Sequence, residues 1–90
     1  MLLFCRSREI IGGQIIIPSE RIYNITAVGC RVNINYDGGE LMEVRENVYQ
    51  PKIETASILY DSSDEVDKII RQFYKSVSNN SNCFYFGGSN

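Results

Sequence analysis

Residues 62–77 carry every sequence signal of an amphipathic helix. Ser62 can cap its start, and Glu65, three residues on, completes a capping box. Acidic residues occupy the first turns and basic residues follow, as the helix dipole favours. The apolar residues recur at helical spacing and form one stripe: Val66, Ile69, Ile70, Phe73 and Val77. The sequence therefore predicts a helix that docks this stripe on the rest of the chain.

The chain before this helix has the pattern of β-structure. Strands are expected over residues 2–5, 14–17, 22–28, 31–36 and 40–45, with a more ambiguous one over 53–60. Gly12 and Gly13 suit a tight turn between the first two, and residues 18–21 suit a single helical turn. Three consecutive isoleucines, residues 15–17, cannot share one face, which favours a central strand covered on both faces.

Two connections and a tail complete the predicted order of elements. Asp37, Gly38 and Gly39 are typical of a hairpin turn, and residues 47–51 are expected to form a loop. Residues 78–82 predict a loose connection to a short aromatic strand, residues 83–86, which could dock on its own sheet or on a neighbour's.

Together these elements predict one α+β domain over residues 1–90, β-rich over 1–60 and helical over 61–77. The expected architecture is an antiparallel sheet of five or six short strands with the helix packed across it. A chain of 90 residues is too short for two cores. Small domains without disulfides or metals often gain stability by self-association, so a homo-oligomer is expected.

Composition excludes several classes of function. The net charge is -2, which offers no general attraction to DNA, RNA or an anionic membrane. The apolar start, residues 1–5, is too short for a signal peptide or a membrane span. Three widely spaced cysteines, Cys5, Cys30 and Cys83, indicate reduced thiols and a cytoplasmic location.

Catalysis and metal binding have little support in the sequence. The chain has no histidine, which removes the usual general base near neutral pH and the usual zinc ligand. The acidic residues around the helix start lack the glycine and distant glutamate of a calcium loop, and they are interpreted as stabilising the helix. We therefore predict a protein that is not an enzyme and needs no metal or cofactor.

The basic side chains of the helix are the first candidates for ligand binding. Arg71 and Lys75 lie four residues apart, where their charges repel unless an anion lies between them. Asp67 could instead pair with Arg71 on a solvated face. Tyr74 could support a base or ribose beside a phosphate. Arg31 and Tyr36 are further candidates, although tyrosines in so small a domain also serve core rims and interfaces.

Two resemblances bear on function. The order QIIIPSERIYNI, RVNINYDGGELMEVREN and DEVDKIIRQFY resembles small flagellar FlbD-type proteins. It covers residues 14–74 and implies a protein-interaction or regulatory module without a small ligand. The chain is also similar to phage Thoeris anti-defence sponges, small oligomers that sequester cyclic nucleotide signals without cleaving them. That resemblance implies phosphate contacts from Arg71 and Lys75.

Of these two functions, the sequence favours the second: a non-enzymatic oligomer that holds an anionic, nucleotide-like small molecule. It accounts for the basic pair, the tyrosines and the separable tail together. The interaction module remains the alternative. The expected ligand-binding residues are Arg71, Lys75, Tyr74, Arg31 and Tyr36.

Overall fold

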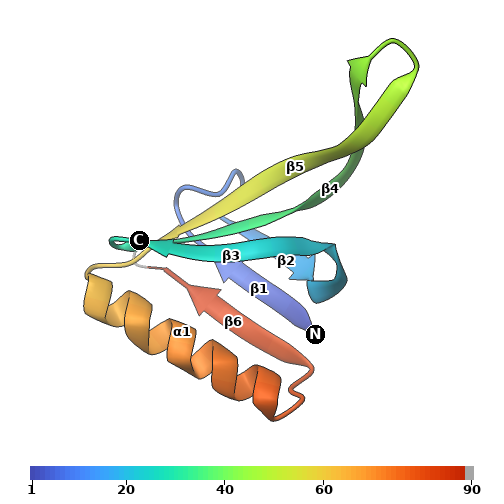
Figure 1. Ribbon diagram of the computed structural model, residues 1–90. Coiled ribbons are helices and arrows are strands. Elements are labelled where there is room, and N and C mark those ends of the chain that lie inside the picture. The colour runs from blue at the N-terminus through green and yellow to red at the C-terminus, as the bar shows by residue number, and fades with distance from the viewer. Residues whose placement is uncertain (89–90) are drawn as a thin grey trace.

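A computed structural model describes residues 1–88 and confirms the α+β class (Figure 1). The elements in chain order are strands β1 (Leu2–Arg6) and β2 (Gln14–Pro18), the short 3-10 turn η1 (Ser19–Arg21), strands β3 (Ile22–Val28), β4 (Arg31–Arg45) and β5 (Val48–Leu59), helix α1 (Ser63–Ser78) and strand β6 (Cys83–Gly87). The helical turn after Pro18 and the aromatic terminal strand are as the sequence predicts.

The strands form two three-stranded sheets instead of the single sheet expected. One has the order β2-β1-β6, and the other has the order β3-β4-β5. The division falls at Pro18, which ends β2 and begins η1, so the chain enters a second sheet at Ile22. The first sheet is mixed, because β6 pairs with β1 in parallel. A parallel neighbour needs a long crossover connection, and α1 lies within that connection.

The core lies where the inner faces of the two sheets meet α1. Its buried apolar residues come from all three layers: Leu3, Cys5, Ile17, Val32, Ile34, Ala56, Ile58, Tyr60, Val66 and Phe86. Figure 1 shows α1 running alongside β6. The Phe73 ring of α1 lies 5.3 Å, centroid to centroid, from both Phe84 and Phe86 of β6. This aromatic cluster fixes the helix to its own chain's terminal strand.

The helix begins and packs largely as its sequence pattern predicts. Ser62 caps it, and its Oγ accepts a hydrogen bond from the Glu65 amide at 3.3 Å. The Glu65 carboxylate accepts from the amide of Asp61 at 3.2 Å, one residue earlier than a capping box requires. Val66 is buried, whereas Val77 at the other end of the stripe is 48% exposed. The apolar stripe therefore packs against the core mainly through the first three turns of α1.

The predicted hairpin turn at residues 37–39 is wrong, and so is most of the loop at 47–51. β4 runs on through these glycines, and the chain turns at residues 46–47 instead. Asp37 pairs with Ile53 and Leu41 pairs with Pro51, so residues 38–40 bulge opposite Lys52 alone. Gly39 has φ +87°, and glycine adopts such positive φ values both in β-bulges and in hairpin turns. Asn47, with φ +60°, supplies the left-handed residue of the real turn.

The expectation that residues 15–17 form a central, doubly covered strand is also wrong. β2 is an edge strand, and Ile16 on its outer face is 56% exposed. Ile17 is buried and Ile15 is half-buried, because both face the second sheet. Within one chain, nothing described over residues 1–88 covers the outer side of β2. An isoleucine triplet can reflect burial of two residues and an exposed third.

Candidate functional site

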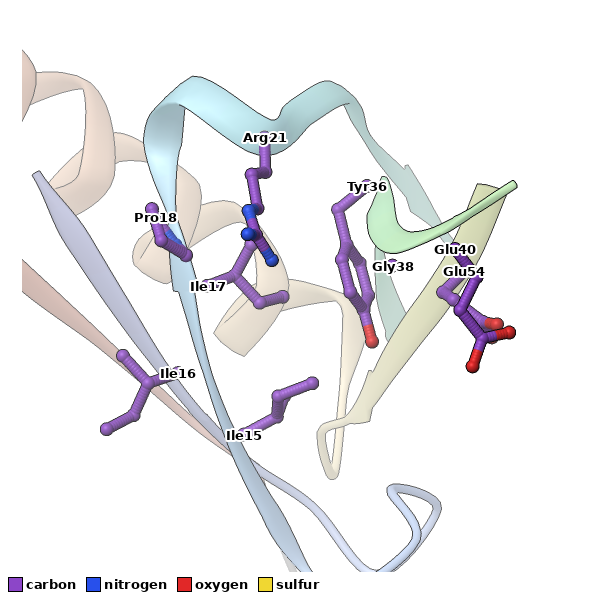
Figure 2. A pocket seen from close by; sticks show the side chains of 9 residues that line it. All are labelled: Ile15, Ile16, Ile17, Pro18, Arg21, Tyr36, Gly38, Glu40 and Glu54. Carbon is purple, nitrogen blue, oxygen red and sulfur yellow. The ribbon is translucent and has the colours of Figure 1, made fainter. Parts of the chain in front are cut away.

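A cavity of about 300 Å³ lies between β2, η1 and the β4–β5 pair (Figure 2). Its polar side chains are Arg21, Tyr36, Glu40 and Glu54. The wall on the β2 side is apolar and is formed by residues 15–18. Figure 2 shows Arg21 on one side of the Tyr36 ring and the two glutamates on the other. The cavity thus joins one cation, one phenol and two carboxylates over an apolar floor.

Local sequence explains how Arg21 and the bulge come together. Pro18 starts the single turn η1, and Arg21 is the last residue of that turn. The bulge in β4 then brings its glycines against the cavity: the position of a Cβ on Gly39 would lie 3.6 Å from Nη1 of Arg21. On Gly38 it would lie 2.5 Å from Cγ of Glu54, so a side chain there would require the Glu54 side chain to shift. The two glycines therefore let the backbone approach both charged groups.

Lys52 offsets part of the negative charge at the far side of the cavity. Its Nζ lies 3.5 Å from Oε1 of Glu54 and 4.0 Å from Oε2 of Glu40. By contrast, Arg21 forms no ion pair with any residue among 1–88. Its guanidinium keeps its full set of donors for a ligand, and a guanidinium matches the geometry of a phosphate or carboxylate.

Tyr36 keeps its hydroxyl proton at neutral pH. Burial raises the pKa of this phenol, and the nearby Glu54 carboxylate and Cys5 thiol raise it further. The half-buried ring offers an apolar face, and the hydroxyl can donate one hydrogen bond. Such a group supports a sugar or base beside an anion held by Arg21.

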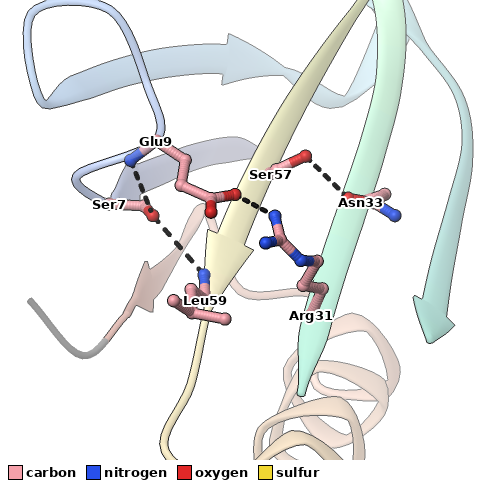
Figure 3. Close-up of polar contacts among 6 residues, drawn as sticks. All are labelled: Ser7, Glu9, Arg31, Asn33, Ser57 and Leu59. Carbon is pink, nitrogen blue, oxygen red and sulfur yellow. Dashed lines mark hydrogen bonds and ion pairs between the residues drawn. The ribbon is translucent and has the colours of Figure 1, made fainter. Parts of the chain in front are cut away.

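The structure places the predicted site residues in three separate locations. Tyr36 lines the cavity, as described. Arg31, although on the same strand, lies five residues away and on the opposite face of β4, where it pairs with Glu9 (Figure 3). Within one chain, Arg31 and Tyr36 are therefore not brought together.

The helix residues form a separate exposed surface. Arg71, Tyr74 and Lys75 are all exposed on α1, and Tyr74 is 66% exposed to solvent. No ion pair joins Asp67 to Arg71 in the part of the chain that the structure describes. None of the three lines the Arg21–Tyr36 cavity or four further cavities formed by residues 1–88. They can contact a ligand from one side only.

Sequence reasoning missed Arg21, Glu40 and Glu54. Arg21 closes a Pro-Ser-Glu-Arg turn, and its only local signal was the prediction that this turn is helical. The two glutamates lie on either side of the turn at residues 46–47 and meet only through the register of β4 and β5. Their proximity depends on a bulge that the sequence indicated as a turn.

A second polar cluster joins the two sheets and has a structural role (Figure 3). The buried Ser7 Oγ accepts from the amide of Glu9 at 3.3 Å and from that of Leu59 at 3.4 Å. On the neighbouring strands, the Ser57 hydroxyl donates to Oδ1 of Asn33 at 2.7 Å. The Leu59 contact ties the end of β1 to β5, whereas the Glu9 contact is local to the turn that follows β1.

The described chain contains no helix long and apolar enough to cross a bilayer. Among residues 1–88 there is also no group of three or more cysteine, aspartate or glutamate side chains placed to hold a metal ion. No protein-family model, no curated protein and no solved structure matches this chain. The cavity and the surface of the molecule are therefore the observations from which its function is inferred.

Proposed function

We propose that this protein is a non-enzymatic, cytoplasmic homo-oligomer that binds and sequesters an anionic, nucleotide-like small molecule. The observation that carries the proposal is the Arg21–Tyr36 cavity. At about 300 Å³ its volume lies at the lower end of small-molecule sites, so it suits one nucleotide unit of a larger ligand.

Each part of the cavity matches one part of such a ligand. Arg21, which has no ion-pair partner among residues 1–88, can donate to a phosphate, and Tyr36 offers a ring and a hydroxyl to a ribose or base. Glu40 and Glu54 can accept hydrogen bonds from ribose hydroxyls or an exocyclic amine. The apolar wall formed by residues 15–18 can pack against the flat face of a nucleotide base. No general base is needed, because the proposed action is retention without cleavage.

Calorimetry with cyclic dinucleotides, cyclic trinucleotides and isomers of cyclic ADP-ribose tests this function. Arg21→Ala should weaken binding by about 1.5–3 kcal/mol, the range for a charge-assisted hydrogen bond, and Tyr36→Phe by about 1 kcal/mol. Arg45→Ala is the matched control, since Arg45 is an exposed arginine at the far end of β4. Absence of binding to every member of the panel would refute the ligand-binding function.

The exposed helix residues remain a second candidate contact for the same ligand. Arg71 and Lys75 are one turn apart beside Tyr74, and a neighbouring subunit could close a site over them or contribute Arg31. Arg71→Ala and Lys75→Ala belong in the same calorimetric series. Loss of affinity in these variants, with Arg21→Ala unaffected, would assign the ligand to the helix surface.

A protein-interaction module is the alternative function, and one observation favours it. Large apolar side chains are exposed on the distal parts of β4 and β5 and on the outer face of the first sheet. Such surfaces are typical of contacts with other polypeptides. Native mass spectrometry of protein purified from cells separates the two functions, because a retained nucleotide, a subunit count or a bound polypeptide each changes the mass in a distinct way.

A further inference from the structure

The distal parts of β4 and β5, residues 40–54, form an arm that extends away from the body (Figure 1). Every residue from 40 to 53 is exposed. Strand register places Glu43 opposite Tyr49 and Leu41 opposite Pro51, so these side chains share one face with Ile53. On this face Leu41 is 70% exposed and Ile53 is 59% exposed.

A two-stranded arm of this kind lacks the cover that strand pairs need. An isolated hairpin is marginally stable in water and gains stability when its apolar face is packed. Its edges are poorly suited to adding another strand: Pro51 lacks an amide proton on β5, and the bulge at residues 38–40 interrupts β4. The face of the arm is therefore the surface that requires a partner.

The body of the chain carries an uncovered apolar surface of its own. Ile16, Phe4 and Tyr85 lie in one row across β2, β1 and β6, with Leu2 beside them. We name this surface, together with Arg6 and Gln14 at its rim, the open face. It contains a groove of about 540 Å³ lined by Phe4, Arg6, Gln14, Ile16 and Tyr85, with Cys5 and Ile15 beneath.

Charge distinguishes the arm from the open face. Residues 40–54 hold four glutamates against Arg45 and Lys52, a net charge of -2 that equals the charge of the whole chain. The charged side chain lining the groove is Arg6. An acidic, apolar arm thus complements a basic-rimmed, apolar groove.

We propose that the arm of one subunit docks on the open face of a second copy of this chain, and that the exchange is reciprocal. Leu41, Tyr49 and Ile53 pack over Phe4, Ile16 and Tyr85, while Glu43 and Glu46 lie near Arg6. A reciprocal contact is closed and two-fold symmetric, so it yields a dimer. This inference specifies the self-association within the proposed function and is independent of the ligand, which calorimetry measures separately.

Single substitutions at exposed positions test the two surfaces. Ile16→Lys on the open face and Leu41→Lys on the arm should each weaken dimerisation about tenfold or more in analytical ultracentrifugation. Ile11→Lys is the matched control, because Ile11 is fully exposed in the turn between β1 and β2 and belongs to neither surface. Thermal unfolding by circular dichroism confirms that each variant folds.

A mixing experiment identifies which surface meets which. An equimolar mixture of Ile16→Lys and Leu41→Lys can form a heterodimer with one intact contact, so it should associate more tightly than either variant alone. Two arms in contact would make Ile16→Lys harmless, and two open faces in contact would make Leu41→Lys harmless. Either result overturns the proposal.

Charge reversal gives an independent measure of the same contact. Arg6→Glu alone and Glu43→Lys/Glu46→Lys together should each weaken dimerisation about tenfold, and combining all three changes should restore most of it. A wild-type chain that stays monomeric at about 100 µM, where even a weak specific dimer is populated, would also overturn the proposal. A dimer affinity that is unchanged by either charge reversal would overturn it as well.

Discussion

The thiol of Cys5 links the stability of the fold to alkaline pH. Burial raises its pKa from 9.0 to about 12. Below pH 9 both the folded and unfolded chains keep the proton; between pH 9 and 12 only the folded chain does, so the free energy of unfolding falls as pH rises. The slope is about 1.4 kcal/mol per pH unit for this one proton. Urea titrations between pH 8 and 11 should show a shallower decline for Cys5→Ala than for the wild type.

Other groups also titrate in this range, so the comparison needs a control. Cys83→Ala removes an exposed thiol and should keep the wild-type slope. Burial also raises the pKa of Tyr60, which adds to the alkaline destabilisation in all three proteins. Equal slopes in Cys5→Ala and the wild type would contradict the assignment to Cys5.

Single residues also show where sequence reasoning failed. Gly39 belongs to the segment that the sequence predicts as a hairpin turn, but its positive φ serves a bulge and a turn equally well. The choice depends on which residues pair across the sheet, and that information is not local. Arg21 had no distinguishing pattern, because only folding brings it beside Tyr36 and Gly39.

The start of α1 offers a test at the level of one element. Ser62→Ala removes the side-chain acceptor for the Glu65 amide and should lower the free energy of unfolding by about 1 kcal/mol. Ser63→Ala is the matched control, since Ser63 is the exposed first residue of the helix and alanine is well tolerated there. Chemical denaturation followed by circular dichroism measures both. Equal losses in the two variants would show that the cap contributes little.

Elements with a local cause were predicted well. The helix follows from its cap and its apolar spacing, and β1, β2, β3 and β6 follow from short apolar runs between glycine, proline and polar segments. β4 is predicted as two strands, residues 31–36 and 40–45, because Asp37, Gly38 and Gly39 indicate a turn between them. β5 is predicted to begin at residue 53 and begins at Val48, because the exposed residues 48–52 have no burial pattern that marks them as a strand. The candidate site was predicted at Tyr36 alone of the residues that line it.

At the scale of the whole molecule, the arrangement of sheets could not be read from the sequence. Strand patterns specify which residues face a core, but they do not specify which strands are neighbours. β6 pairs with β1 at the far end of the chain, and that pairing, with its parallel direction, depends on how α1 packs. The division into two sheets creates both the cavity and the open face.

The parallel pairing makes β6 part of the folding unit, and Phe86 is the residue that tests this. Its side chain is fully buried against Phe84 and Phe73, with ring centroids at 4.9 Å and 5.3 Å. Phe86→Ala should cost about 3–5 kcal/mol, most of the stability of a small domain. Urea denaturation should therefore show a largely unfolded chain, whereas Phe86→Leu retains most of the volume and should lose about 1.5 kcal/mol or less.

Tyr85→Ala is the control on the same strand. Tyr85 points to the open face and is 53% exposed, so its loss should change the free energy of unfolding by about 1 kcal/mol or less while weakening self-association. Neighbouring side chains of β6 thus have separate surroundings: Phe86 packs between the helix and the first sheet, and Tyr85 lies on the open face, the proposed docking surface. If Phe86→Ala were as stable as Tyr85→Ala, β6 would be an attached segment and not a part of the core.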